Sequence, residues 1–460
     1  MLKKIFSVLL VSAILAVLLM SIQTLNKPAL AESDETELWA VMIGVTEYQC
    51  PLCVFDKEWN VYPVGVKHPD DSARDLAGQL SPITSQDHIK LVLNEQATNA
   101  GIYYAVKWLA ENADANDTVL FYFCGHSAPE NLGSYDYLVS ASQLAEWLDG
   151  IHSQKVVVIL DTCYAGSFGK ELNQNGRVVL MSCEPMESSL EDRELKQAVF
   201  THYVLQALND FDGADTNSNY ELSAEEIFDY ADPKTVAEIV APFANLPAFS
   251  GGNIQHPTLY IPPYKYGEIN LFMKVIFHTD AEVASDTAVL TVDGKSYLPN
   301  ELPASFDWLS GTTHRFDIPL QIDAEDGTRL VFTSWNDGGI SSSRIVSGGG
   351  EYTANYKTQY KLTVESPYGR PEGDGWYDSG SKATVSINAN EGKIIQHTFT
   401  GWSDDYTGQE TTVSLTMDKT KTIKANWKSN YLRLYLLVIG FIIIVAGITA
   451  ALTIRKKKPL

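Results

Sequence analysis

The chain has 460 residues, of which 45% are hydrophobic and 20% are charged, so it is long enough for several domains with separate cores. Its formal net charge is −23. Nucleic-acid binding depends on clustered lysine and arginine, and this acidic composition therefore argues against a nucleic-acid partner.

Residues 1–31 have the pattern of a secretory signal peptide. Lys3 and Lys4 precede an apolar run that ends near Met20, and Ala29 and Ala31 form a small-residue cleavage site. An uncleaved N-terminal anchor is the alternative interpretation. The pattern predicts that this segment directs export and is then removed.

The chain contains five cysteines, too few for a disulfide scaffold in a protein of this size. Because five is odd, at least one thiol is unpaired within the chain. Cys50 and Cys53 are interpreted as a local disulfide or two free thiols, since the sequence offers no second pair with zinc-ligand spacing. The pairing of Cys124 and Cys183 stays open.

Residues 38–263 alternate between apolar strands and amphipathic helices. Strands are predicted at 39–45, 89–93, 118–123, 155–160 and 177–182, and helices at 70–80, 98–113, 142–148, 196–208 and 225–230. This alternation is typical of an α/β domain with a mostly parallel sheet covered by helices on both faces. In such sheets, ligands bind beyond the carboxyl ends of the strands.

Beyond residue 267 the helical periodicity disappears, and short alternating strands with glycine-rich turns follow. A motif F-T-x-W at 332–335 is followed by A-N-Y at 354–356, and F-T-x-W at 399–402 is followed by A-N-W at 425–427. This internal repeat predicts two all-β modules, at 267–358 and 359–428. They resemble the wall-associated β-repeats of bacterial and archaeal surface proteins, and we interpret them as a stalk rather than a specific binding module.

Residues 434–454 form an uncharged apolar run that is long enough to cross a bilayer. The tail at 455–460 begins with one arginine and three lysines, which favour the cytoplasmic side. A GPI signal would not end in such a cationic cluster. The sequence therefore predicts a single-pass cell-membrane protein with an extracellular body and a cytoplasmic C-terminus.

Two predicted strands end in residues that suit nucleophilic catalysis. The strand at 118–123 leads into Gly125 and His126, and the strand at 155–160 leads into Asp161 and Cys163. A cysteine attacks as its thiolate, and a neighbouring histidine can accept the thiol proton. Each residue alone is more often an ordinary core or surface residue. Because sequential strands usually pair, the joint pattern predicts a catalytic dyad of His126 and Cys163.

The segments VLFYFCGHS (119–127) and VVVILDTCYAGS (156–167) resemble the caspase-like cysteine peptidases. They look closest to the metacaspase-like and prokaryotic caspase-domain branch, peptidase family C14. The legumain-like peptidases, which share the fold and the order of the dyad, are a related alternative. The resemblance covers roughly residues 38–263. It implies a caspase-like fold and hydrolysis of protein or peptide substrates, with no required cofactor.

The resemblance also implies residue roles. His126 is then the general base and acid, Cys163 is the nucleophile, and the backbone N–H groups of Cys163 and Ser127 form the oxyanion hole. The family usually has glycine at the position of Ser127. A positive φ there would make a serine side chain a source of strain. The short separation of His126 and Cys163 is a second departure and suggests trimmed loops around the cleft.

An acidic specificity pocket is a further implication. Metacaspase-like enzymes place acidic side chains there and cleave after arginine or lysine. Asp161 lies two residues before the nucleophile, as in that branch, and Asp70 or Asp71 corresponds to a second acid. The alternative for Asp161 is a strand-end residue that caps a helix.

Residues 215–226 have the spacing of an EF-hand calcium loop. The predicted oxygen ligands are Asp215, Asn217, Asn219, Glu221, Ser223 and Glu226. Tyr220 occupies the position that is usually glycine, and the three neutral ligands lower the charge of the site. A relic loop that leads into the following helix is the alternative.

Three classes of function remain. The first is a membrane-anchored extracellular cysteine endopeptidase that cleaves after arginine or lysine. The second is a catalytically inactive caspase-like protein for binding or assembly at the cell surface, and the third is a structural surface protein. The sequence leaves the oligomeric state open.

Overall fold

The computed structural model describes residues 35–49, 67–192, 194–240, 255–261, 268–281 and 287–456. The chain divides into two compact units. The first contains the chain up to Val275 with Phe306–Thr313 and Ser347–Gly350, and the second contains the remaining β-rich part and the C-terminal helix. The predicted signal peptide, Cys50 and Cys53 lie outside the described residues.

The first unit is built on a six-stranded sheet in the order β12-β8-β7-β3-β1-β2. In chain order, the strands are β1 (Leu38–Gly44), β2 (Ile89–Leu93), β3 (Thr118–Gly125), β7 (Lys155–Thr162), β8 (Arg177–Met181) and β12 (Thr258–Tyr260). All neighbouring strands are parallel except β12, which runs antiparallel to β8. The predicted, mostly parallel sheet is therefore confirmed.

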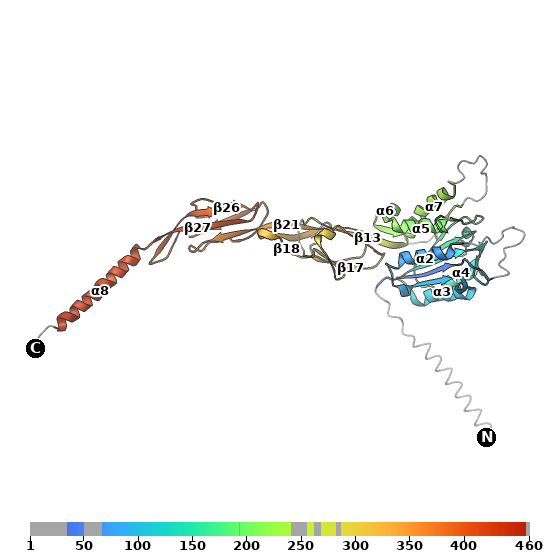
Figure 1. Ribbon diagram of the computed structural model, residues 1–460, viewed down its shortest axis with the longest axis horizontal. Coiled ribbons are helices and arrows are strands. Elements are labelled where there is room, and N and C mark those ends of the chain that lie inside the picture. The colour runs from blue at the N-terminus through green and yellow to red at the C-terminus, as the bar shows by residue number, and fades with distance from the viewer. Residues whose placement is uncertain are drawn as a thin grey trace, which may run out of the picture. The chain divides into compact units, whose positions relative to one another are not determined.

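Helices cover both faces of this sheet (Figure 1). Helices α2 (Pro69–Leu80), α5 (Val199–Asn209) and α7 (Ala224–Val240) pack on one face, and α3 (Asn99–Asn112) and α4 (Ala141–Leu148) pack on the other. Helix α3 begins where the sequence predicts, because the Thr98 side chain caps it by accepting a 2.9 Å hydrogen bond from Gly101 N. Two apolar clusters, one on each face, form the core.

Short elements connect these strands and helices. They are β4 (Ser127–Ala128), β5 (Asn131–Gly133), β6 (Leu138–Ser140), β9 (Glu191–Asp192), β10 (Gln197–Ala198), α6 (Phe211–Ala214) and β11 (Glu221–Ser223). Strand β10 pairs with β9 up to Ala198, so α5 starts at Val199 rather than at residue 196 as expected. Helix α7 runs past the expected end at residue 230 and through Pro233, because Ala231 and Thr235 stay buried against the core.

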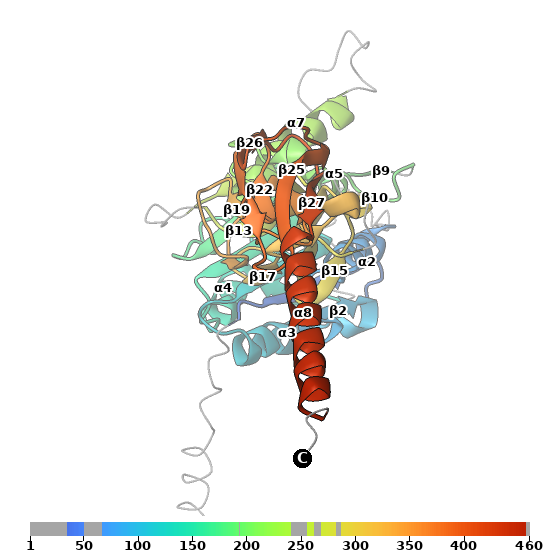
Figure 2. The same ribbon diagram turned by 90° about the vertical axis from the view of Figure 1, so that its left-hand side faces the viewer.

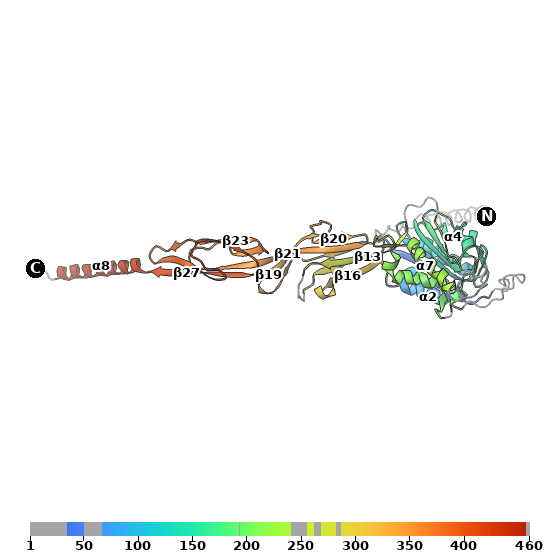
Figure 3. The same ribbon diagram turned by 90° about the horizontal axis from the view of Figure 1, so that it is seen from above.

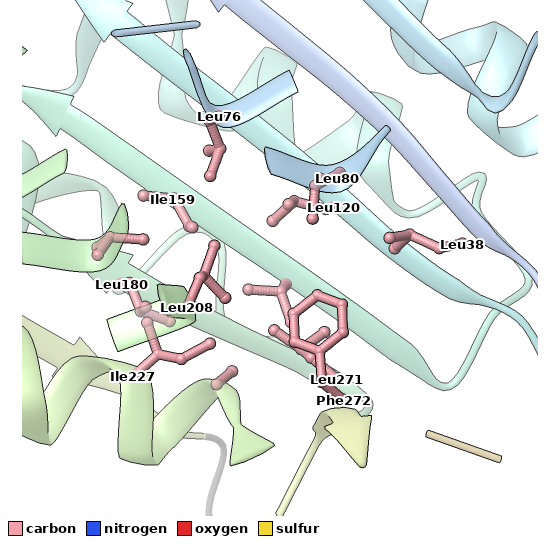
Figure 4. A pocket seen from close by; sticks show the side chains of 13 residues that line it. Leu38, Leu76, Leu80, Leu120, Ile159, Leu180, Leu208, Ile227, Leu271 and Phe272 are labelled. Carbon is pink, nitrogen blue, oxygen red and sulfur yellow. The ribbon is translucent and has the colours of Figure 1, made fainter. Parts of the chain in front are cut away.

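A void of about 10 Å³ lies between the sheet and the helices of the first face (Figure 4). Apolar side chains converge on it from the sheet and from both α2 and α7, and Leu271 and Phe272 complete its lining. The void is close to the smallest that holds one water, and its apolar lining offers no hydrogen bond. We therefore interpret it as a packing defect of the core and not as a ligand site.

The second unit is all-β until its final helix. Its strands are β14 (Leu290–Val292), β15 (Lys295–Tyr297), β17 (His314–Asp317), β18 (Gln321–Asp323), β19 (Thr328–Trp335), β20 (Ser343–Val346), β21 (Gly350–Glu365), β22 (Gly375–Asp378), β23 (Lys382–Ser386), β24 (Asn390–Glu391), β25 (Gln396–Asp404), β26 (Thr412–Thr416) and β27 (Lys421–Asn430). Strands β13 (Asn270–Thr279) and β16 (Ala304–Leu309) belong partly to each unit. The predicted change from α/β to all-β structure is confirmed.

The two sequence repeats have the same local structure. In β19, Phe332 pairs with Tyr356 and Trp335 with Ala354 of β21, with a bulge between Phe332 and Ser334. The pairing of β25 with β27 repeats this pattern, since Phe399 pairs with Trp427, Trp402 pairs with Ala425, and a bulge follows Phe399. Strand β21 pairs with β19 and, nearer its end, with β27, so the expected boundary at 358/359 falls inside this strand (Figure 3).

Helix α8 (Leu432–Lys456) follows β27 as an uninterrupted helix (Figure 2). Within it, Leu432–Thr453 has a mean hydropathy of 2.7 and is long and apolar enough to cross a membrane. Tyr431 and Tyr435 are exposed at its start, where aromatic side chains commonly lie at a membrane interface. The helix is compatible with single-pass anchoring.

Close packing at the carboxyl end of β1 yields a stability prediction. A Cβ atom at Gly44 would lie 2.5 Å from Pro69 O and 2.6 Å from Asp70 Cα, so Gly44→Ala should force β1 and α2 apart and cost about 1–3 kcal/mol. Gly78→Ala in α2 is the matched control. Its Cβ meets nothing within 4 Å, and it should stabilise the helix by about 0.5–1 kcal/mol.

Thermal unfolding of the full chain in detergent, followed by near-UV circular dichroism, measures both effects. Equal midpoints for the two variants would contradict the predicted contact between Gly44 and the start of α2.

Candidate active site

The register of β3 and β7 brings the two predicted catalytic residues to neighbouring strand ends. In this parallel pair, Cys124 lies opposite Asp161 and Gly125 lies opposite Thr162. His126 and Cys163 are the next residues along the two strands, so both leave the sheet at the same edge. Both side chains are half-buried. The register thus places His126 and Cys163 at the ends of neighbouring strands.

The surroundings of His126 keep its imidazole neutral. Its backbone N–H donates a 2.6 Å hydrogen bond to Tyr48 Oη, and the centres of the two rings are 5.2 Å apart. Its carbonyl oxygen accepts a 2.8 Å hydrogen bond from Gly133 N. Burial lowers the pKa of His126 below its usual value of 6.5, because desolvation disfavours the imidazolium form.

The turn after β7 presents the Cys163 thiol. Tyr164 has a left-handed φ of 58° and donates a 2.7 Å hydrogen bond from its N–H to Glu187 O. The Cys163 sulfur lies 3.7 Å from Ser189 O. Burial raises the pKa of the Cys163 thiol above its usual value, because the thiolate loses hydration. The directions of both pKa shifts therefore favour a neutral thiol at Cys163 and a neutral imidazole at His126.

Ser127 fits its position without backbone strain. It lies in β4, pairs with Leu132 of β5, and does not have a positive φ. Its hydroxyl donates a hydrogen bond to Cys163 O, and Thr162 Oγ1 lies 2.8 Å from Ser127 Oγ and 2.7 Å from Gly125 O. The serine side chain thus ties the histidine loop to the cysteine loop, a contact that glycine cannot make.

Asp161 is buried two residues before Cys163, with only 2% of its surface exposed. Its carboxylate accepts hydrogen bonds from Ser189 Oγ at 2.6 Å, from Thr201 N at 2.9 Å and from Thr201 Oγ1 at 2.7 Å. Among the described residues, these partners are all neutral. Burial raises the pKa of Asp161, although these hydrogen bonds oppose the shift. Asp161 is therefore a buried carboxylate held by neutral donors.

The other two predicted acids lie at the start of α2. Asp70 accepts a 2.6 Å hydrogen bond from Thr46 Oγ1, and Asp71 forms a 3.0 Å ion pair with His68. Within the described part of the chain, neither carboxylate shares a hydrogen-bond partner with Asp161. Asp70 links β1 to α2, and Asp71 is an exposed surface acid.

Glu191 is a functional candidate that the sequence did not indicate. Its half-buried carboxylate accepts hydrogen bonds from Lys67 N at 2.8 Å and His68 N at 3.2 Å. Burial raises its pKa, and the nearby Asp161 charge adds to the shift. The two contacting segments are more than 120 residues apart in the chain. No local motif could have shown that these segments meet.

The predicted calcium loop has the backbone shape that its spacing requires. Tyr220 has a φ of 63°, the left-handed conformation for which the loop usually has glycine. Asp215 accepts hydrogen bonds from Asn219 N and Tyr220 N, and Glu226 accepts them from Thr216 N and Ser223 Oγ. The described residues contain no cluster of three or more His, Cys, Asp or Glu side chains that could hold a metal ion. The loop would instead need amide, hydroxyl and backbone oxygens.

Family comparison defines the class of both units. Residues 79–246 match the Peptidase C13 family, the legumain-like cysteine peptidases of the caspase-fold clan. Residues 360–431 match the Divergent InlB B-repeat domain. The chain therefore contains a caspase-fold domain of a cysteine peptidase family, followed by a B-repeat domain and an apolar helix. A comparison with curated proteins finds no match.

The expected assignment to peptidase family C14 is corrected by this match. The two branches share the fold and the order of the histidine and the cysteine along the chain. The order of His126 and Cys163 therefore does not separate them. The legumain-like alternative is the one that the family comparison supports.

Two solved structures are also similar to this chain. Protein GSU0716 from Geobacter sulfurreducens is 12% identical, with 50% of this chain and 95% of that chain covered and a TM-score of 0.35. Caspase-1 from Spodoptera frugiperda is 11% identical, with 49% and 86% covered and a TM-score of 0.35. Values of this size carry no conclusion about activity or substrate.

The raised thiol pKa predicts how Cys163 reacts. Since its pKa lies above the usual 9.0, the rate of iodoacetamide alkylation at Cys163 should keep rising with pH beyond that value. Site-resolved mass spectrometry measures the rate, and the buried Cys124 and Cys183 serve as slow internal references. A rate that levels off by about pH 7 would instead indicate a preformed thiolate–imidazolium pair and contradict the neutral dyad.

Proposed function

We propose that this protein is a cysteine endopeptidase, anchored by α8 to a cell membrane, that hydrolyses peptide bonds with His126 and Cys163. The register of β3 and β7 is the observation that supports this most directly, because Gly125 lies opposite Thr162 and the two reactive residues follow at once. The match of residues 79–246 to a cysteine peptidase family supports the same reaction class. Protein or peptide substrates follow from that class.

In this mechanism, the Cys163 thiol transfers its proton to His126 as the sulfur attacks the scissile carbonyl carbon. The backbone N–H groups of Cys163 and Ser127 stabilise the oxyanion. The C–N bond then breaks, and His126 gives the proton to the leaving amine. Water, deprotonated by His126, hydrolyses the thioester and regenerates the thiol. No cofactor is required.

The neutral resting dyad suits this order of proton transfer. His126 acts as a base only when it is neutral. Because its pKa is lowered, the imidazole stays neutral at pH values below the usual pKa of 6.5. The raised pKa of the Cys163 thiol keeps the proton on sulfur until a substrate is in place. A neutral thiol also reacts slowly with oxidants, which suits an exported protein.

We infer a preference for arginine or lysine before the scissile bond. Asp161 is a fully buried carboxylate with neutral partners, and its partner Ser189 also lies close to Cys163. Glu191 is a second carboxylate, half-buried, whose pKa the Asp161 charge helps to raise. A basic side chain would compensate the charge that burial makes costly. Asp70 and Asp71, at the start of α2, would contribute to this preference only a longer-range electrostatic attraction for the basic side chain.

The location that we propose is the outer face of a cell membrane. The apolar helix α8 is followed by basic residues, which favour the cytoplasmic side. The B-repeat match at 360–431 is consistent with a surface protein. The β-rich unit would then act as a stalk between the peptidase domain and the membrane.

We further propose that residues 215–226 bind calcium. The left-handed φ of Tyr220 supports this, and so does Glu226, whose carboxylate is 3% exposed and has only neutral hydrogen-bond partners among the described residues. Glu221 would contribute its backbone carbonyl, since its side chain binds Asn270 and Ser310. With few acidic ligands, the affinity should be near that of extracellular modules, about 10⁻⁴–10⁻³ M.

Turnover of matched peptides tests the proposed peptidase. Full-length protein in nanodiscs should cleave a peptide with arginine before the scissile bond faster than the asparagine and aspartate versions. Cys163→Ala should abolish cleavage, and His126→Ala should lower kcat by about 10²–10⁴-fold. Asp161→Asn should reduce the arginine preference by about tenfold.

Retained cleavage in Cys163→Ala, or a clear aspartate preference in the wild type, would contradict the proposal. Binding without any cleavage would favour the alternative of an inactive caspase-like binding protein.

Thermal unfolding tests the calcium loop. A calcium concentration five times the Kd should stabilise the wild type by about 1 kcal/mol, and Glu226→Gln should lose that gain. Glu194→Gln, which removes an exposed acid outside the loop, is the matched control and should keep it. An identical midpoint with 10 mM calcium and with chelator would refute calcium binding at the proposed affinity, about 10⁻⁴–10⁻³ M.

A further inference from the structure

The loop at residues 182–190, which follows β8, passes beside Cys163. We name it the cleft loop. Glu187 O accepts hydrogen bonds from Tyr164 N at 2.7 Å and from the Cys183 thiol at 3.4 Å. Ser189 O lies 3.7 Å from the Cys163 sulfur, and Ser189 Oγ donates to Asp161 at 2.6 Å. The position of this loop therefore determines what surrounds both Cys163 and Asp161.

A fully buried glutamine from a distant segment holds the cleft loop. Gln255 is 0% exposed, and its side-chain oxygen accepts a 2.9 Å hydrogen bond from Leu190 N. Its amide nitrogen donates to Ser182 O at 2.8 Å and to Ser189 Oγ at 3.2 Å. The side chain thus joins the beginning and the end of the loop.

The orientation of the Gln255 amide makes the whole network consistent. Because Ser189 Oγ accepts a hydrogen bond from Gln255, its own proton is directed to Asp161. Reversing the amide would place its nitrogen against the Leu190 N–H and its oxygen against Ser182 O. Only glutamine can supply this donor and acceptor pair at this length, since glutamate lacks the donor and methionine lacks both.

The next residue reinforces the same contact. His256 N donates a 2.7 Å hydrogen bond to the Glu187 carboxylate, and His256 Nδ1 lies 2.7 Å from it. Residues 255 and 256 directly precede β12, which pairs with β8. They also lie beyond the residues that match the peptidase family, 79–246. Gln255 and His256 thus hold the cleft loop from outside the family-matched segment.

We propose that Gln255 is a positioning residue for substrate selection, an inference that rests on the proposed peptidase function. By holding Ser189 against Asp161, it fixes the charge and width of the pocket for the side chain before the scissile bond. Without Gln255, the Ser189 hydroxyl is free to turn away and the cleft loop can move. The carboxylate then loses one of its donors, and the pocket loses its fixed geometry.

Three variants test this role in the full-length protein in nanodiscs. Gln255→Met removes all three hydrogen bonds at similar volume, and Ser189→Ala removes the hydroxyl that joins Gln255 to Asp161 while leaving the Gln255 bonds to Leu190 N and Ser182 O. Each should lower the ratio of kcat/KM for the arginine peptide to that for the asparagine peptide by about tenfold, mainly through KM for the arginine peptide. Because both substitutions act on one contact, the double variant should lose no more arginine selectivity than the more strongly affected single variant.

Tyr260→Phe is the matched control, because it removes a 2.9 Å hydrogen bond between the same segment and Asn173 without touching the cleft loop. It should leave the selectivity ratio unchanged. A ratio within twofold of wild type in both single variants would overturn the inference while the peptidase function stands. If Gln255→Met fails to fold, the same ratio of kcat/KM values, measured in Ser189→Ala and Gln255→Glu, decides whether the inference holds. Wild-type protein that cleaves neither peptide would overturn the proposed function and the inference together.

Discussion

The parallel pairing of β3 with β7 is the constraint on which the candidate site depends. All eight residues of β3 are buried, and both faces of the sheet are covered, so burial fixes the register of this pair. A slip by one residue would exchange the faces of every side chain and separate Gly125 from Thr162. The fold therefore uses ordinary hydrophobic packing to bring His126 and Cys163 to neighbouring positions, and the hydrogen bonds of Ser127 and Thr162 join their two loops.

Neutral hydrogen bonds, rather than ion pairs, stabilise the acidic groups of the cleft. Asp161 receives its bonds from Ser189 and Thr201, and Glu191 receives its bonds from backbone N–H groups. Such donors keep a buried carboxylate in place without neutralising its charge. The negative potential stays available to a substrate, which links the architecture of the domain to the preference that we propose. Glu226, in the loop for which we propose calcium binding, likewise has neutral donors.

Much of the fold could be predicted from the sequence because its signals are local. Apolar runs such as β2 (Ile89–Leu93) were predicted at their exact bounds, and the Thr98 cap and the repeated bulges beside Trp335 and Trp402 follow from short motifs. The neighbouring positions of His126 and Cys163 could also be predicted, since strand ends and residue types are local. Contacts between distant segments were not, and Ser189, Glu191 and Gln255 reach the cleft only through such contacts. The family branch was predicted incorrectly, because the two branches share the fold and the order of His126 and Cys163 along the chain.

Covalent trapping tests the central claim most directly, namely that His126 and Cys163 form one reactive centre. The full-length protein is treated with a peptidyl acyloxymethyl ketone that ends in arginine, and the modified residue is mapped by mass spectrometry. The account predicts a single adduct on Cys163 that disappears in His126→Ala and in the unfolded protein. An adduct on Cys124 or Cys183, or a folded wild-type protein that forms none, would contradict it.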